Sequence, residues 1–303
     1  MSHISVLLHE TVDALLANRD TGIYIDGTFG RGGHTRLLLS KLGSDAQVYG
    51  FDKDPQALAV AHQLEQEDPR FKIIHASFAD IQTELEQRGI TQVEGVMADL
   101  GVSSPQLDQA ERGFSFMQDG PLDMRMDNSQ GKTAAEWLLS IEEEALANII
   151  YQYGEERYSR RIARAIKQAG ALETTAQLAE LVKTAHPKWE KHKHPATRTF
   201  QAIRIAINKE LEDIETFLPQ AVTLLKPEGR LAVISFHSLE DRLIKQFIQK
   251  ESTLPEDSGW GLPQKQVDSR RLKKISRIRA SEEEVKANPR SRSAWLRVAE
   301  RLV

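Results

Sequence analysis

Strand-like and helix-like segments alternate over the first hundred residues, and this alternation constrains the fold more than any other feature of the sequence. Short apolar runs occupy residues 23–25, 48–51, 71–74 and 93–98. Stretches with a helical spacing of apolar residues, such as residues 57–64, separate them. Strands that alternate with helices in this way form a parallel, doubly wound sheet. We therefore expect an α/β protein.

Three of the four apolar runs end in an aspartate, namely Asp26, Asp52 and Asp99. In a parallel, doubly wound sheet, ligands bind beyond the carboxyl ends of the strands. We therefore expect these three carboxylates to lie at the edge of the sheet where a ligand binds.

A different organisation follows the fourth apolar run. Residues 101–130 are rich in Gly, Pro, Ser and Asp and predict a long loop of the kind usually kept for function. Thr133 and Glu136 then have the spacing of a capping box, which predicts the start of a helix. Further helices are expected, without strands between them, at residues 157–169, 175–185 and 196–217.

Strand-like patterns return at residues 229–235 and 295–298. The simplest organisation is a helical domain, residues 108–210, inserted into one α/β domain. Residues 1–107 and 211–303 would together form this α/β domain. No internal repeat or low-complexity tract interrupts it.

The composition excludes several classes of protein. The 303 residues are 40% hydrophobic and 28% charged, which is typical of a globular protein. The absence of cysteine excludes disulfides, a thiolate nucleophile and a Cys-ligated zinc. No apolar run approaches the roughly 18–20 residues that a membrane span needs, and the N-terminus lacks the pattern of a signal peptide. We expect a cytoplasmic protein without a membrane partner.

The charge is unevenly distributed along the chain, although its net value is only −4. Residues 154–210 contain 12 Lys and Arg against 6 acidic residues, and residues 265–303 contain 12 against 5. Two basic stretches on an acidic protein indicate that particular surfaces meet a polyanion. The alternative for each stretch is a solvated helix face with paired charges.

A glycine-rich turn follows the first apolar run, with the pattern Asp26-x-Thr28-x-Gly30-x-Gly32. The fingerprint for a nicotinamide cofactor requires a third glycine where Thr35 stands, which argues against an oxidoreductase. The turn resembles instead the first motif of class I S-adenosylmethionine-dependent methyltransferases, with threonine in place of one glycine. Such a turn can also simply tighten a strand-to-helix connection.

Two further residues have the spacing of a nucleoside site. Asp52 follows Gly32 by twenty residues, where an acid can bind both hydroxyls of a ribose. The alternative is an N-cap for the helix after Pro55, a position that Asp54 can also fill. Phe78 follows the third strand and can stack on an adenine or pack in the core.

Longer polar blocks resemble the MraW (RsmH) family of bacterial RNA methyltransferases, and the resemblance covers nearly the whole chain. The first block is Ala98-Asp99-Leu100-Gly101-Val102-Ser103-Ser104-Pro105-Gln106-Leu107-Asp108. The other blocks lie at residues 6–10, 112–116, 119–126, 194–201, 235–242 and 288–293. Blocks of this length are far more specific than a glycine-rich turn.

The resemblance implies methylation of the exocyclic N4 amine of a cytidine in the decoding region of 16S rRNA (C1402 in RNA numbering). The implied partner is 16S rRNA within the small ribosomal subunit, with no obligate protein partner, and the inserted helical domain would recognise the RNA. The family pattern also implies residues that line the S-adenosylmethionine site: Gly32, Gly33, His34, Asp52, Phe78, Asp99 and Gln106.

Methylation of this amine requires help, because its lone pair is delocalised into the cytosine ring. Acceptors for its N–H groups and correct orientation can together lower the barrier by several kcal/mol. Asp99 is the leading candidate acceptor, and Ser103 or Ser104 can contribute a hydroxyl or a carbonyl. Amino-methylating enzymes commonly place an Asp, Asn or Ser followed by Pro-Pro and an aromatic residue after the fourth strand. The segment Ser103-Ser104-Pro105-Gln106 keeps the serine and one proline but lacks the aromatic residue. The candidates to hold the base, each of which can also be core, are Phe114, Phe116, Phe236 and His237.

A stacked cytosine must be extruded to react, and basic residues of the insert can hold the surrounding phosphates. The leading candidates to bind RNA are Arg160, Arg161, Lys193, Arg198 and His237. No metal is expected, because the histidines lack metal-ligand spacing and methyl transfer from a sulfonium needs none. A non-catalytic RNA-binding assembly factor on the same fold is the remaining alternative.

Overall fold

The structure is a computed structural model that describes residues 5–188, 194–254 and 268–303. The chain divides into two compact units. Met1–Gly101 and Leu211–Val303 form the first, called here the sheet unit, and Val102–Glu210 form the second, called the helical unit. The helical unit begins six residues before the predicted domain boundary at residue 108, so the unit boundary divides the polar block of residues 98–108 after Gly101.

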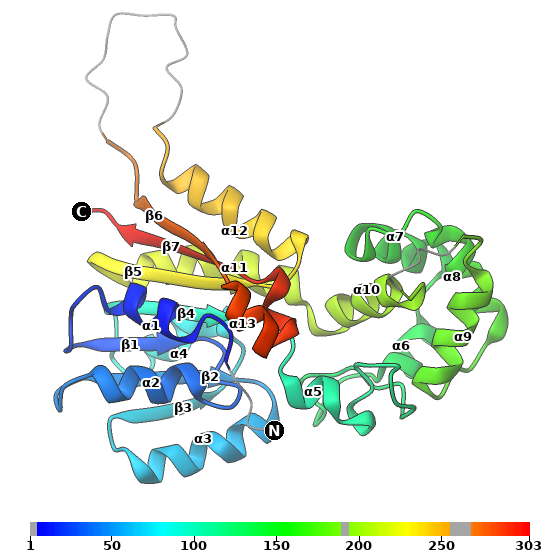
Figure 1. Ribbon diagram of the computed structural model, residues 1–303, viewed down its shortest axis with the longest axis horizontal. Helices are drawn as coiled ribbons and strands as arrows, with labels where there is room; N and C mark the ends of the chain where they lie inside the picture. The colour runs from blue at the N-terminus through cyan, green and yellow to red at the C-terminus, as the bar shows by residue number, and fades with distance from the viewer. Residues whose placement is uncertain (1–4, 189–193, 255–267) are drawn as a thin grey trace, which may run out of the picture. The chain divides into compact units, whose positions relative to one another are not determined.

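The described residues of the sheet unit form a seven-stranded sheet with the strand order β3-β2-β1-β4-β5-β7-β6 (Figure 1). Strands β1 to β5 are parallel, whereas β7 runs antiparallel to both β5 and β6. The strands are β1 (Ile23–Asp26), β2 (Gln47–Asp52), β3 (Phe71–His75), β4 (Val93–Asp99), β5 (Leu225–Ser235), β6 (Leu272–Arg279) and β7 (Trp295–Arg301). The expected α/β class is confirmed.

The sequence analysis missed β6, which it treated only as part of the basic stretch of residues 265–303. The segment Leu272–Arg279 alternates only weakly, and four of its eight residues are Lys or Arg. This is the composition of an edge strand, in which charged side chains face water and discourage pairing with another sheet. Pairing with β7, rather than a local apolar pattern, makes the segment a strand.

Helices cover both faces of the sheet, because successive strand side chains point to opposite faces. The side chain of Tyr24 belongs to the apolar core on one face of the sheet, and that of Ile25 belongs to the core on the other face. Helices α1 (Leu8–Leu16), α2 (Gly33–Lys41), α3 (Pro55–Glu67) and α13 (Glu282–Ala287) pack on the face of Tyr24. Helices α4 (Ile81–Glu86), α11 (Glu210–Leu224) and α12 (Ser238–Glu251) pack on the face of Ile25.

The helical unit has its own apolar core, which includes Leu146, Ile150, Ile162 and Phe200. Its helices are α5 (Ser104–Asp108), α6 (Ala134–Ser140), α7 (Glu143–Gly154), α8 (Ser159–Ala169), α9 (Thr175–Ala185) and α10 (Ala196–Asn208). The capping box predicted at the start of α6 is confirmed, because the side chains of its two residues each accept from the other's amide. Among the described residues, no helix combines the length and apolar character needed to cross a bilayer.

The expectation of one helix over residues 196–217 is wrong. Helix α10 ends at Asn208, and Lys209 has a left-handed backbone with φ 53° before α11 begins. The Asn208 side chain accepts from the amide of Met126 at 2.7 Å and donates to the carbonyl of Met124 at 2.8 Å. These contacts with a distant loop stabilise the end of α10, and the helical periodicity of the sequence does not report them.

Candidate functional site

The glycine-rich turn after β1 is held by the neighbouring strands on both sides. The amide of Gly27 donates to the carbonyl of Met97 in β4 at 2.8 Å. The amide of Gly30 donates to the Asp52 carboxylate at the end of β2 at 2.8 Å. Gly30 has φ 56°, which favours glycine, and a Cβ there would have only a carbonyl oxygen at 3.9 Å for a neighbour. The turn is therefore anchored to β2 and β4 by hydrogen bonds, and the space next to Gly30 is open.

Two glycines are required where the turn enters α2. Gly32 caps the helix with φ 74°, and a Cβ on it would lie 2.6 Å from the ring of Phe29. A Cβ on Gly33 would lie 2.0 Å from the hydroxyl oxygen of Ser5. The amino end of α2 is thereby brought close to the turn, and the partial positive charge of a helix N-terminus favours an anionic ligand group.

Asp26 is buried at the end of β1 and does not face solvent. Its carboxylate accepts from the Thr35 hydroxyl at 2.7 Å and from the Thr28 amide at 3.1 Å. Burial raises the pKa of Asp26 to about 6, although both hydrogen bonds oppose the shift. Thr35 thus has a function that the sequence analysis missed. The signal was present, because Thr35 occupies the position where the nicotinamide fingerprint needs glycine.

Asp52 is not the N-cap of α3. Asp54 fills that position, accepting from the Gln56 amide at 2.9 Å. The Asp52 carboxylate instead accepts from the amides of Asp54 at 2.9 Å and Gly30 at 2.8 Å. Burial raises the pKa of Asp52. Its carboxylate therefore has a defined position at the end of β2, next to the open turn.

Asp99 ends β4, and its amide donates to the Thr28 hydroxyl at 2.6 Å. Its Oδ1 is buried and has no hydrogen-bond partner among the described residues, while Oδ2 lies 3.8 Å from Nδ1 of His34. Burial, and then the charges of Asp26 and Glu240, raise the pKa of Asp99 well above its usual value. A carboxylate with these properties is a strong acceptor for a donor group of a ligand.

His34 and Phe78 complete the predicted residues of the sheet unit. The buried His34 ring lies with Nε2 3.1 Å from the carbonyl oxygen of Val6 and with Nδ1 directed at Asp99. Phe78 packs edge-on against Phe217 of α11, with ring centroids 5.1 Å apart, and remains partly exposed. The ring therefore contacts the core on one side and retains surface for a ligand.

Gln106, Ser103 and Ser104 belong to the helical unit. Ser103 caps α5, with its hydroxyl accepting from the Gln106 amide at 3.5 Å and its amide donating to the Gln106 side-chain oxygen at 2.9 Å. Gln106 is buried and Ser104 is partly exposed. This capping box sets the conformation of the segment directly after the Asp99 strand.

Of the four residues considered for holding the base, Phe114 is buried and Phe116 packs against the core of the helical unit. Phe114 is buried, with the Arg112 guanidinium 5.8 Å from its ring centroid. Phe116 packs edge-on against Phe200 at 4.8 Å and lies 4.7 Å from the His194 ring. Core packing, the competing interpretation, describes these two rings better than base stacking does.

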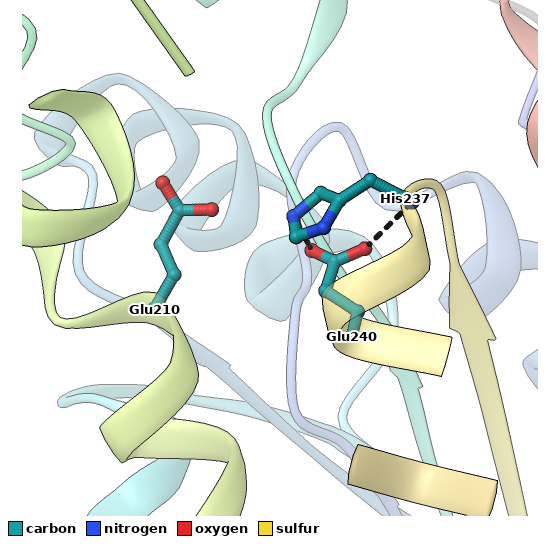
Figure 2. Close-up of side chains that lie close together, drawn as sticks. All are labelled: Glu210, His237 and Glu240. Carbon is teal, nitrogen blue, oxygen red and sulfur yellow. Dashed lines mark hydrogen bonds and ion pairs between the residues drawn. The ribbon is translucent and has the colours of Figure 1, made fainter. Parts of the chain in front are cut away.

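His237 of the sheet unit pairs with a buried acid on its own helix. Figure 2 shows the His237 ring and the Glu240 carboxylate pointing toward each other, with Nε2 3.2 Å from Oε1. The other carboxylate oxygen accepts from the amides of Phe236 at 2.8 Å and His237 at 3.3 Å. Glu240 fixes the chain between β5 and α12 and also raises the pKa of Asp99. The sequence analysis assigned Glu240 no role.

The basic candidates of the helical unit differ in their surroundings. Arg160 and Arg161 lie exposed on α8, and neither has an ion-pair partner in the part of the chain that the structure describes. Arg198 lies 3.7 Å from the buried carboxylate of Glu156. Lys193 lies outside the described residues. The α8 arginines are therefore the best placed of these residues to meet a polyanion.

The topology, the glycine-rich turn and the acids at the carboxyl ends of β1, β2 and β4 define a Rossmann-like S-adenosylmethionine-dependent methyltransferase. The MraW methylase family model matches residues 1–302. The chain belongs to this family and is a methyltransferase that uses S-adenosylmethionine, so the predictions of family, enzyme class and cofactor are confirmed.

Two sequence relatives of known name agree with this assignment. A ribosomal RNA small subunit methyltransferase H from Acinetobacter baylyi is 99% identical over 303 residues, which is 100% of both chains. The protein of the same name from a Psychrobacter species is 56% identical over 310 residues, covering 99% of this chain and 91% of its own. An rRNA methylase structure from Streptococcus thermophilus covers 100% of each chain at 13% identity, with a TM-score of 0.46.

Proposed function

We propose that the sheet unit binds S-adenosylmethionine at the carboxyl edge of the sheet and that the helical unit binds 16S rRNA within the small ribosomal subunit. The reaction transfers a methyl group to the N4 amine of C1402, the function of the MraW methylase family. The observation that carries the proposal is the open glycine-rich turn flanked by Asp26, Asp52 and Asp99. A ribosomal substrate places the enzyme in the cytoplasm.

The residues at this edge fit the cofactor. The turn is open above Gly30, and the buried Oδ1 of Asp99 still lacks a donor among the described residues. Asp52 would hold the ribose hydroxyls, Phe78 would pack against the adenine, and the amides at Gly32 and Gly33 would favour the carboxylate of the methionine part. His34 completes the binding residues of the sheet unit, and the family pattern adds Gln106. When bound, the cofactor supplies an activated methyl group on a sulfonium.

Asp99 accepts a hydrogen bond from the N4 amine of the target cytosine. This contact returns electron density to the nitrogen and orients its lone pair, and the raised pKa of Asp99 suits it to receive the proton that the amine loses. Ser103 and Ser104 contribute a second acceptor through a hydroxyl or a backbone carbonyl.

RNA contacts come from both units. Arg160, Arg161, Lys193 and Arg198 neutralise phosphates around the target, so their contribution is salt-dependent and largely independent of sequence. His237 contacts the RNA from the sheet unit. Residues 108–210 thus form the main part of the recognition domain, together with the short segment from Val102 that folds with them.

The test is a methylation assay with labelled S-adenosylmethionine on three substrates: unmodified small subunits, naked 16S rRNA and an assembly intermediate. The product nucleoside is identified by mass spectrometry and its position is mapped. We expect N4-methylcytidine at C1402, formed fastest on small subunits. A product at another base overturns the assigned reaction, and faster turnover on naked rRNA overturns the assigned substrate particle.

A further inference from the structure

A group of basic and aromatic side chains lies at the carboxyl edge of the sheet, on strands that the cofactor site does not use. The strand register connects Asp99, at the cofactor site, with this group. Asp99 of β4 is paired with Ile234 of β5, and the next residue, Ser235, is paired with Trp295 at the start of β7. Trp295 is in turn paired with Arg279 at the end of β6. Three strand spacings of about 4.8 Å separate Arg279 from Asp99.

Two arginine side chains of this group lie over the ring of one tryptophan. The Arg277 guanidinium lies 3.5 Å from the centroid of the Trp295 ring, and that of Arg279 lies 5.7 Å from it. Arg279 also donates to the carbonyl of Arg292 at 3.3 Å. Arg277, Arg279 and Arg292 are exposed, and Trp295 is partly exposed. Stacking holds the cations in place while leaving their outer N–H groups accessible.

The neighbouring acid does not neutralise this group. Asp241 of α12 forms a two-pronged ion pair with Arg297 at 2.7 and 3.0 Å, and Arg277 approaches the same carboxylate at 3.6 Å. One carboxylate therefore faces two guanidinium groups, and Arg279 and Arg292 add two more positive charges. The nearby α13 adds three acids, Glu282, Glu283 and Glu284, and one base, Lys286. With these included, the edge has five positive and four negative charges, so its net charge is still positive.

We propose that Arg277, Arg279, Arg292 and Trp295 form an RNA-binding surface, called here the basic edge, which holds phosphates of the strand flanking the target nucleotide. Guanidinium groups match phosphate geometry, and an aromatic ring beside them is typical of surfaces that bind single-stranded nucleic acid. The proposal rests on the proposed function, because it requires an RNA substrate at the carboxyl edge. The sheet unit then binds the RNA through its own residues, independently of the helical unit.

The same strand supplies a matched control. Lys273 and Lys274 lie at the opposite end of β6, five to six residues from Arg279, or about 20 Å along the strand. The test compares Arg277→Gln/Arg279→Gln with Lys273→Gln/Lys274→Gln in the full-length enzyme. Each variant is titrated with a single-stranded 16S rRNA fragment around C1402 at several salt concentrations. Thermal unfolding and cofactor affinity show that both variants are folded.

We expect the arginine variant to lower the slope of log K against log salt by about 1.4, because each phosphate contact on single-stranded RNA contributes about 0.7. The lysine variant keeps the wild-type slope, and Arg292→Gln lowers it by about 0.7. Equal slopes for the arginine variant and the wild type overturn the basic edge. Equal losses in the arginine and lysine variants overturn it too, because they indicate a general charge effect.

Wild-type methylation of small subunits, measured in parallel, separates this inference from the proposed function. Formation of N4-methylcytidine together with an unchanged slope overturns only the basic edge. Absence of that product together with the expected loss of slope overturns the proposed function and supports an RNA-binding edge. If the arginine variant binds RNA normally but loses affinity for a polyglutamate peptide, the surface binds acidic protein and the inference is wrong.

Discussion

The sheet unit and the helical unit present their functional groups in opposite ways. In the sheet unit, Asp26, Asp52 and Asp99 are held by backbone amides, threonine hydroxyls and strand ends, with pKa values raised by burial. In the helical unit, Arg160 and Arg161 lie exposed on a helix whose other face is buried. On the proposed function, the cofactor site would depend on a fixed geometry, whereas the RNA site would depend on the number and sign of charges. Single substitutions should therefore be severe in the first and graded in the second.

The largest effect is expected for Gly32→Ala. The new Cβ would meet the Phe29 ring at 2.6 Å in addition to adopting a left-handed backbone. We expect at least a 100-fold loss of cofactor affinity, measured by calorimetry, and a lower Tm. Gly131→Ala is the matched control, because Gly131 has the same φ of 74° but no atom within 4 Å. It should cost only about 1–2 kcal/mol of stability. Similar losses of cofactor affinity in both variants would contradict the role of the close approach.

Asp99→Asn should reduce kcat at saturating cofactor by about 10²–10⁴, the usual contribution of a positioned proton acceptor. The raised pKa of Asp99 adds a pH signature. Because the ionised carboxylate accepts the proton, the wild-type rate falls as pH drops through this raised pKa, above the ordinary carboxylate range. The rate of the variant should not show this fall at low pH. Unchanged turnover at saturating cofactor would exclude Asp99 as the acceptor.

Asp26→Asn should change the pH dependence of stability. Because the folded-state pKa of Asp26 is raised from 3.8 to about 6, its ionisation opposes folding above pH 6. This penalty, about 3 kcal/mol at neutral pH, is relieved as pH falls from 6 toward 3.8. We therefore expect urea unfolding to show that the wild type gains stability relative to the variant on acidification through this window. If the free energies of unfolding of the two proteins change in parallel with pH, the Asp26 carboxyl is not the source of the pH dependence.

The smallest effect per residue is expected for the helical unit. Arg160→Glu/Arg161→Glu should weaken RNA binding about tenfold at low salt, and less at higher salt, because exposed charges are screened. Cofactor affinity should stay at the wild-type value. Lys72→Glu/Arg88→Glu makes the same change of charge on exposed positions of the sheet unit and should bind RNA normally. Unchanged RNA affinity in the α8 variant would exclude these two arginines.

The carboxyl-edge aspartates could be predicted from the sequence because local signals specify them. Apolar runs that end in Asp26, Asp52 and Asp99 form β1, β2 and β4, and the connection order brings their ends to one edge. The family blocks added the reaction and the target base, which no periodicity contains. The residues that hold the cluster in place, Thr35 and Glu240, were quoted in motifs without a role.

Only the tertiary structure decided the features that depend on distant partners. Strand β6 exists because it pairs with β7, and α10 ends where Asn208 bonds a loop some eighty residues earlier. Asp99 has a raised pKa because folding buries it and then brings the charges of Asp26 and Glu240 close to it. Apolar periodicity and turn residues act between near neighbours, so they determine elements and their order. Register, burial and electrostatic coupling act between residues far apart in sequence, and they arise only when the chain is folded.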